Sequence, residues 1–273
     1  MLRSLWTAKT GLDAQQTSLD TISNNLANVS TTSYKRARPI FEDLLYQNLR
    51  SPGLTENAGT PNLASDDNYL PAGLQAGNGS RIAATQRINS AGSLLQSQNP
   101  LDMAINGNGF FRVSTGSGIA YTRAGNFMRS QNGDIVTPSG SALLDNSGLK
   151  INISPNATDI VIGTDGTVTY YKGITTPPVV FNAGKIGIVN FVNPAGLSSV
   201  GGGLYFETPS SGSAVPGVAT QAGYGSISQF YTEQSNVNVA EELVSLIAAQ
   251  RAYEITAKSV SASDQILQKL GQL

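Results

Sequence analysis

Residues 4–29 read SLWTAKTGLDAQQTSLDTISNNLANV, and this stretch carries apolar residues at every seventh position. The apolar positions are Leu5, Leu12, Leu19 and Leu26, with Ile22 and Val29 three residues beyond the last two. Seven-residue spacing predicts a helix with one narrow apolar seam, from about Ser4 to Val29. An isolated helix of this length is only marginally stable in water, so the seam needs a partner.

A second stretch with the same spacing covers residues 239–270. Its apolar residues are Val239, Leu246, Tyr253, Val260 and Leu267, with Leu243 and Leu270 beside them. Asn238 and Glu241 have the spacing of an N-cap and its reciprocal acid, which indicates a helix from this point to about Leu270. We expect the seam residues of both helices to be subunit-packing residues. Their partners are each other, copies of the same chain, or both.

Gly11 lies inside the first predicted helix, where an interior glycine costs roughly 1 kcal/mol relative to alanine. Its presence indicates either a close approach of another helix or a bend, and we favour the close approach. The uncharged polar residues on the other faces of both helices fit packing in an array, since a solvated face usually carries Lys and Glu.

The composition excludes several classes of function. The 273 residues contain no cysteine and no histidine, which excludes disulfide frameworks, Cys/His zinc sites, cysteine nucleophiles and Ser-His-Asp triads. Charged residues make up 13% of the chain, about half the usual share, and the net charge is −1. We therefore expect no nucleic-acid partner, no metal, no cofactor and no enzymatic activity. No run of apolar residues is long enough to span a membrane, and we expect no membrane insertion.

The middle of the chain predicts β structure, and the fold class is therefore α+β. We expect residues 1–32 with 235–273 to form a helical terminal domain, residues 33–80 an extended linker or ribbon, and residues 81–234 a mainly antiparallel β domain. The predicted strands are Gly109 to Val113, Asp134 to Thr137, Ile151 to Ile153, Asp159 to Ile162, Val168 to Tyr171 and Lys185 to Phe191. Asn132-Gly133 and Asp165-Gly166 predict hairpin turns.

Several fragments resemble catalytic or binding motifs but have a simpler explanation. Gly107-Asn108-Gly109 lacks the third glycine and the helix of a dinucleotide site. A hairpin turn explains Asp165-Gly166 better than a calcium loop does. The adjacent pairs Asp66-Asp67 and Glu241-Glu242 cannot flank a sugar bond as glycosidase carboxylates do. Core packing explains the strand tyrosines better than a sugar-stacking face does; these are Tyr121, Tyr170, Tyr171 and Tyr205.

Two terminal motifs are specific enough to compare with known families. The N-terminal motif is residues 24–31, NNLANVST, followed by Tyr34-Lys35-Arg36, and the C-terminal one is residues 235–243, SNVNVAEEL, followed by residues 250–254, QRAYE. Both motifs resemble those of the flagellar basal-body rod and hook proteins. In the interior, residues 104–111 and 121–125 are similar to β-domain motifs of the family. Residues 4–16, 41–47 and 70–75 are most similar to subunits of the distal part of the rod.

The resemblance implies a structural subunit with no catalytic role. Subunits of this family leave the cytoplasm through the flagellar export channel without a cleaved signal and polymerise helically in the periplasm. Terminal helices form the inner tube around the channel, and the β domain forms an outer layer. The expected partners are copies of the chain, proximal rod proteins, the hook protein and the L and P rings, and the expected role is a rigid drive shaft that transmits torque to the hook.

One residue and one segment depart from the family pattern. The family usually has glycine where this chain has Ser33, so we expect a changed backbone conformation in the turn after the first helix. Residues 51–69 form a longer segment than the corresponding one in the family, where this segment is associated with a straight rod. The alternatives are a proximal rod or hook subunit, a secreted wall-processing enzyme, or a binding module whose helices stay folded in the monomer.

Overall fold

The computed structural model describes residues 2–50, 72–172, 179–221 and 223–271, without the side chains of Leu2, Leu267 and Leu270. The chain divides into two compact units. The first, which we call the terminal unit, comprises residues 1–24, 37–86 and 240–273. The second, the β unit, comprises residues 25–36 and 87–239.

The terminal unit contains two long helices and short strands that pair two by two. Strand β1 pairs with β4, and β2 pairs with β3. The bounds of these elements are α1 Leu2–Ala27, β1 Ala37–Asp43, β2 Gln47–Arg50, β3 Leu74–Ala76, β4 Ser80–Arg87 and α2 Val239–Leu270. Among the described residues, neither helix has an apolar stretch long enough to cross a membrane.

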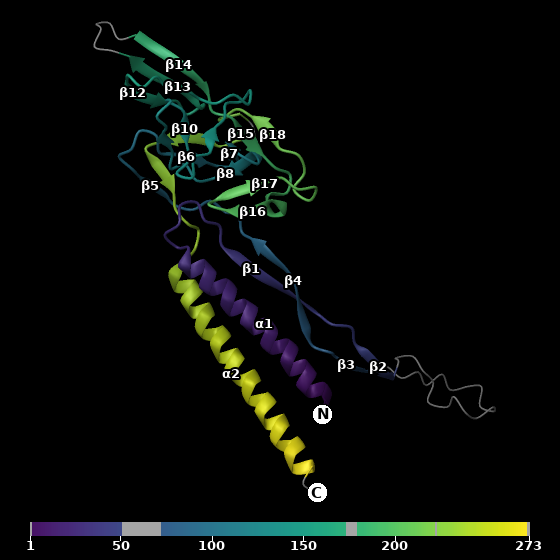
Figure 1. Ribbon diagram of the computed structural model, residues 1–273. Coiled ribbons are helices and arrows are strands. Elements are labelled where there is room, and N and C mark those ends of the chain that lie inside the picture. The colour runs from purple at the N-terminus through teal and green to yellow at the C-terminus, as the bar shows by residue number, and fades with distance from the viewer. Residues whose placement is uncertain (1, 51–71, 173–178, 222, 272–273) are drawn as a thin grey trace, which may run out of the picture. The chain divides into compact units, whose positions relative to one another are not determined.

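Both predicted helices are confirmed. Helix α1 ends at Ala27, two residues before the predicted end, so Val29 lies in the turn that follows and its N–H donates to the carbonyl of Leu26 (3.3 Å). Helix α2 begins directly after Asn238, as predicted, and ends at Leu270. Within the terminal unit the helices lie side by side and antiparallel, with the paired strands along α1 (Figure 1).

The strands of the terminal unit contact α1 at two places. Arg3 donates from Nη1 to Oε1 of Gln47 (3.2 Å) and from Nη2 to the carbonyl of Gly77 (3.2 Å). Further along the helix, Gly79 has φ of +106° and lies so close to Thr10 that a Cβ there would overlap the threonine hydroxyl. The glycine is required at this position both by its backbone conformation and by the close approach.

The paired strands of the β unit run antiparallel in the part of the chain that the structure describes. Strand β7 lies inside the largest sheet, whose order is β16-β17-β8-β7-β11-β10-β9, with β15 pairing to β7 and β18. Smaller sheets have the orders β12-β13-β14, β19-β6 and β20-β5. The bounds of the first strands are β5 Leu94–Gln96, β6 Met103–Asn106, β7 Phe110–Thr115, β8 Gly118–Thr122, β9 Met128–Arg129, β10 Ile135–Val136, β11 Ala142–Leu143 and β12 Ala157–Ile162. The others are β13 Thr167–Lys172, β14 Val179–Lys185, β15 Ile188–Asn190, β16 Ser198–Gly201, β17 Leu204–Phe206, β18 Val215–Gly217, β19 Ser226–Gln229 and β20 Tyr231–Glu233, with a short 3-10 helix at Pro194–Gly196.

The core of the β unit forms because alternate strand residues point inward. Phe111 and Val113 of β7 are fully buried and pair with Thr122 and Ala120 of β8. The ring of Phe111 meets that of Phe127 edge to face, with centroids 5.4 Å apart. A second cluster is aromatic, and its members are Phe110, Tyr121, Val189, Phe191, Leu197 and Tyr205.

Both predicted hairpin turns are confirmed. Gly133 has φ of +88° between β9 and β10, and Gly166 has φ of +85° between β12 and β13. Both glycines adopt the left-handed conformation that tight hairpin turns need. Strands also form in the predicted places at Phe110–Thr115, Ala157–Ile162 and Thr167–Lys172.

Two strand predictions were wrong in detail. The segment from Ile151 to Ile153 forms only an isolated bridge from Asn152 to Asp134. Both isoleucines are buried, but their N–H groups donate to different segments, to Leu143 and Gly133, so no ladder develops. The run from Lys185 to Phe191 is split between β14 and β15, because Gly187 packs closely against the backbone of Asp145. Residues 51–69 lie outside the described residues.

Candidate subunit-packing surface

The predicted seam of α1 is largely covered. Its residues up to Ile22 belong to the terminal unit, whereas Leu26 and Val29 belong to the β unit. Ile22 is buried, and the other seam residues are half-buried; these are Leu5, Leu12, Leu19, Leu26 and Val29. Because α2 lies on one side of α1 and the paired strands on another, only a narrow face of α1 is exposed (Figure 1).

The predicted seam of α2 is less covered. Leu246 and Val260 are half-buried, whereas Val239, Leu243 and Tyr253 are exposed. The side chains of Leu267 and Leu270 lie outside the described residues. Because three of its described residues are exposed, the predicted seam does not account for the whole contact of α2 with α1.

Small residues make the contact between the helices, and the sequence analysis missed most of them. A Cβ on Gly11 would lie 3.6 Å from Cγ2 of Thr256, which is ordinary van der Waals contact. This supports the close approach that we favoured for Gly11. Ala14 and Ala249 are both 7% exposed, so they are more deeply buried than the leucines of the seam. On α2 the covered small residues recur every seven positions, at Ala249, Thr256 and Ser263.

A groove of about 630 Å³ runs between the two helices towards the N-terminal end of α1. Small and hydroxyl-bearing side chains make up most of its wall. The lining residues are Arg3, Ser4, Thr7, Ala8, Ile255, Thr256 and Ser259.

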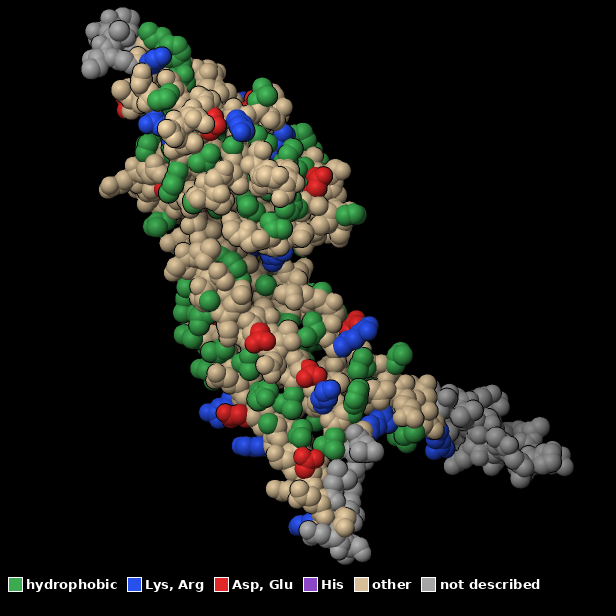
Figure 2. Space-filling model, viewed as in Figure 1, with side chains coloured by type: hydrophobic (Ala, Val, Ile, Leu, Met, Phe, Trp, Pro, Cys, Tyr) green, Lys and Arg blue, Asp and Glu red, His purple; other side chains and the backbone are tan. Residues whose placement is uncertain are grey.

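Helix α2 exposes large apolar side chains on more than one side, and Val244 and Ile255 share its outer side, away from the seam that contains Leu246 and Tyr253. Val244 and Ile255 are each 67% exposed, and Val239, Leu243, Ile247, Tyr253 and Ile266 are exposed as well. On α1, Trp6 is 58% exposed, with the ammonium of Lys9 5.4 Å from its ring centroid. Figure 2 shows apolar side chains at intervals along the helices of the terminal unit.

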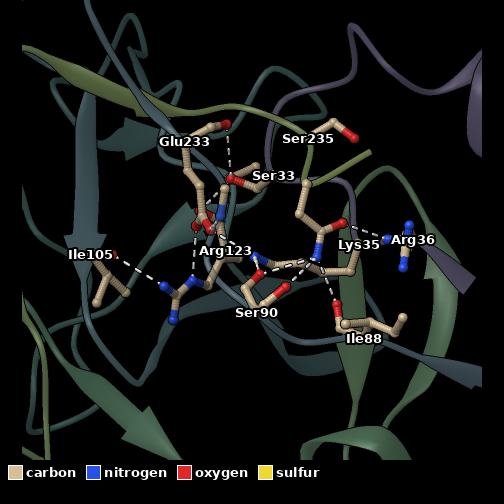
Figure 3. A network of polar contacts seen from close by, with 12 residues as sticks. Ser33, Lys35, Arg36, Ile88, Ser90, Ile105, Arg123, Glu233 and Ser235 are labelled. Atoms are coloured by element: carbon tan, nitrogen blue, oxygen red, sulfur yellow. Dashed lines mark hydrogen bonds and ion pairs between the residues drawn. The ribbon is translucent and has the colours of Figure 1, made fainter. Parts of the chain in front are cut away.

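A buried polar network ties the ends of the β unit's chain together (Figure 3). Glu233, at the end of β20, is 1% exposed and accepts from Nζ of Lys35 at 2.6 Å and from Nε of Arg123 at 2.9 Å. The N–H of Gly92 also donates to its Oε1 (2.9 Å). Arg123 donates further to the carbonyls of Gly109 (2.7 Å) and Ile105 (3.1 Å). The network joins segments that are far apart in sequence.

The charges of this network shift the pKa values of its members. Burial acts to raise the pKa of Glu233, but the guanidinium of Arg123 and the ammonium of Lys35 outweigh it, and the pKa lies below its ordinary value. Burial lowers the pKa of Lys35, although Glu233 opposes this effect. One carboxylate therefore faces two buried cations, and backbone carbonyls accept further hydrogen bonds from both cations.

Ser33 adopts the left-handed backbone conformation that glycine accommodates most readily, with φ of +56°. The N–H of Ser33 donates to the carbonyl of Glu233 (2.8 Å), and its buried hydroxyl donates to the carbonyl of Arg123 (2.9 Å). These hydrogen bonds offset the strain of a side chain in the left-handed region.

The residues considered for other chemistry have structural roles. Tyr121 and Tyr205 are buried in the aromatic cluster and do not form a sugar-stacking face. Burial and the neighbouring Glu207 raise the pKa of Tyr121 to about 12. Asp165 accepts from Lys185 (2.9 Å), which, with Thr167, lowers its pKa to about 2. Within the described residues, no group of three His, Cys, Asp or Glu side chains is placed to hold a metal ion. Asp66 and Asp67 lie outside these residues.

Three family models match the chain, and all describe flagellar proteins. Residues 5–35 match the flagella basal body rod protein family, and residues 228–273 match the C-terminal region of the flagellar basal body rod FlgEFG proteins. Residues 104–170 match the D1 domain of the flagellar hook proteins FlgE, FlgF and FlgG. The chain is thus of the class of flagellar rod and hook proteins, with one terminal helix before and one after an antiparallel β unit in the sequence.

Full-length relatives narrow the class further. The chain is 48% identical over 274 residues to the flagellar basal-body rod protein FlgG of Buchnera aphidicola subsp. Acyrthosiphon pisum, and both chains are covered completely. Identity to the proteins of the same name is 41% in Caulobacter vibrioides and 37% in Bacillus subtilis, with 100% of this chain and 99% of each relative covered. The chain belongs to the family of the flagellar basal-body rod protein FlgG. It is a structural, non-enzymatic component of the distal rod of the flagellar basal body.

Proposed function

We propose that copies of this chain polymerise helically through their terminal helices and so build a rigid, hollow drive shaft. The observation that carries the proposal is the exposed apolar side of α2, where residues such as Val244 and Ile255 have no covering partner within the described chain. Burial of such side chains against further copies releases about 25 cal/mol per Å² of apolar surface. An interface between two different faces of the same subunit repeats head to tail, and when its rotation does not close into a ring the repetition produces a helical polymer.

The low charge of the chain supports the same proposal. Charged residues make up 13% of the sequence and the net charge is −1, so copies repel one another only weakly. A subunit surrounded by its own copies needs such a surface. We assign polymerisation to residues 1–32 with 235–273, an extended linker to residues 33–80, and an outer layer to residues 81–234.

The seam residues have a defined part in this proposal. They hold α1 and α2 together and, where they are exposed, contact further copies. These residues are Leu5, Leu12, Leu19, Ile22, Leu26, Val29, Val239, Leu243, Leu246, Tyr253, Val260, Leu267 and Leu270. Torque passes along the polymer because every copy contacts several neighbours, and stiffness grows with the number of contacts.

The further partners follow from the position of a distal rod. We propose that the polymer joins proximal rod proteins at one end and the hook protein at the other, and turns inside the L and P rings. The chain reaches the periplasm through the flagellar export channel without a cleaved signal, and the finished tube continues that channel.

Deletion and restoration of the gene test the proposed function. Basal bodies from the deletion strain should show a short proximal rod without a hook under cryo-electron microscopy, and restoration should extend the rod. Complete rods and hooks in the deletion strain would contradict the proposal. A strain that keeps a full-length rod but lacks the hook would indicate a hook subunit instead, and loss of the whole rod would indicate a proximal rod subunit.

A further inference from the structure

The exposed face of α1 carries a stripe of residues spaced seven apart. Trp6, Asp13, Asp20 and Ala27 are all exposed, and we call them the acidic stripe. Seven residues correspond to nearly two helical turns, so the four side chains lie along one side of the helix. The two carboxylates stand about 10.5 Å apart along the axis, at 1.5 Å per residue.

The outer side of α2 carries a stripe of opposite charge with the same spacing. Its members Val244, Arg251, Lys258 and Gln265 are all exposed, and we call them the basic stripe. Arg251 and Lys258 are separated by the same distance along the helix as Asp13 and Asp20. Within the described part of the chain, none of these four charged side chains has an ion-pair partner.

We propose that the acidic stripe of one copy packs against the basic stripe of a second copy, a proposal that rests on the self-assembly proposed above. Copies in a helical polymer share one direction, and α1 and α2 run antiparallel within each copy, so α1 of one copy meets α2 of the next in antiparallel orientation (Figure 1). In that orientation Asp13 faces Lys258 and Asp20 faces Arg251.

The register set by the charges also pairs the ends of the stripes. Trp6 falls opposite Gln265, next to the exposed Ile266, and Ala27 falls opposite Val244. Apolar or neutral contacts therefore lie at both ends and two ion pairs lie between them. An antiparallel helix pair with this pattern has a defined register, because a shift by one heptad would leave one carboxylate and one cation unpaired.

The register implies an axial offset between neighbouring copies. In an antiparallel helix pair, the sequence numbers of two residues that face each other always add up to the same total. Within one copy Gly11 lies against Thr256, so this total is 267. For the proposed pairs between copies, Asp13 with Lys258 and Asp20 with Arg251, the total is 271. The difference of four residues displaces one copy by about 6 Å along the helix axis relative to the arrangement inside a copy.

Charge reversal tests the pairing in full-length protein expressed in the deletion strain. Three variants are compared: Asp13→Lys with Asp20→Lys, Arg251→Glu with Lys258→Glu, and the combination of all four substitutions. Each two-site variant should yield at least about tenfold fewer rods with hooks, because like charges then face each other between copies. The combination should recover rods to within about twofold of the unchanged chain, because opposite charges face each other again.

A matched control separates the pairing from a general effect of charge. Asp159→Lys makes the same change of charge as Asp20→Lys on an exposed residue of β12 and should leave rod number unchanged. Normal rods in both two-site variants, or no recovery in the combination, would overturn the pairing while leaving the proposed self-assembly in place. Complete rods in the deletion strain itself would overturn the proposed function, and the pairing with it.

Discussion

The Nζ atom of Lys35 lies 2.6 Å from Oε1 of Glu233, and the two residues are 198 positions apart in the sequence. Their side chains are 4% and 1% exposed, so water does not screen the pair. Lys35 belongs to the segment that follows α1, and Glu233 ends the last strand of the β unit. The β unit is therefore closed by an ion pair between the first and last parts of its chain.

Replacing Glu233 should destabilise the β unit strongly. Glu233→Gln leaves Lys35 and Arg123 buried without a counter-charge, and loss of one partner of a buried ion pair typically costs about 3–5 kcal/mol. Urea unfolding of the full chain, followed by tyrosine near-UV circular dichroism, measures the change. Asp165→Asn is the matched control, because its ion pair with Lys185 is exposed and contributes about 1 kcal/mol or less. Equal losses in the two variants would contradict this account of the network.

The lowered pKa of Glu233 predicts a loss of stability in acid. Because its folded-state pKa lies below the ordinary value of 4.5, the unfolded chain takes up a proton first as the pH falls. The stabilisation is complete above the unfolded pKa and is lost as the pH falls through the folded pKa. Urea midpoints measured from pH 6 downwards should fall more steeply in the unchanged chain than in Glu233→Gln, and identical pH dependence in both would refute the assignment.

Replacing Ser33 by glycine should cost less stability than replacing it by alanine. Ser33→Ala keeps the strained left-handed backbone and loses the hydroxyl bond to the carbonyl of Arg123, with an expected cost of about 1–2 kcal/mol. Ser33→Gly loses the same bond but relieves the strain, which offsets part of the loss despite the greater freedom of glycine in the unfolded chain. Thermal unfolding compares the two. A glycine variant less stable than the alanine variant would show that the strain is negligible.

A charge on the seam should block rod assembly without unfolding the β unit. The test residues Leu19, Leu246 and Val260 belong to the terminal unit and are all half-buried, so an aspartate at any one of them places a carboxylate against apolar surface outside the β unit. We expect loss of swimming and of rods with hooks, with unchanged tyrosine circular dichroism. Val192→Asp is the control, because Val192 is 88% exposed in the β unit and should tolerate the charge. Normal swimming by the seam variants would argue against the assigned role.

The helices and hairpins could be predicted because their signals are local. Seven-residue spacing predicted α1 and α2, and Asn132-Gly133 and Asp165-Gly166 predicted two turns. The strand predicted from Ile151 to Ile153 was wrong because these residues are buried without forming a strand ladder. An alternation of apolar residues indicates burial but not strand pairing. Which strands pair with β7 depends on contacts between distant residues, and no local pattern encodes them.

The subunit-packing surface was predictable only in part, because contacts between residues far apart in the sequence leave no local pattern. Leucine spacing identified which residues lie on the helices, but the contact at Gly11 and Thr256 depends on small residues, which carry little signal in an apolar pattern. The network around Glu233 joins residues from three separate parts of the sequence. Lys35 and Ser33 were singled out only through the resemblance to a family, and their partners became visible in the structure.

Helical reconstruction of purified basal-body rods by cryo-electron microscopy, at a resolution that separates side chains, would show directly whether the terminal helices join the copies. We expect α1 and α2 of each copy to contact the helices of neighbouring copies, with the exposed side of α2 around Val244 and Ile255 covered in the rod. Copies joined only through their β units, with that side of α2 still facing solvent, would contradict it.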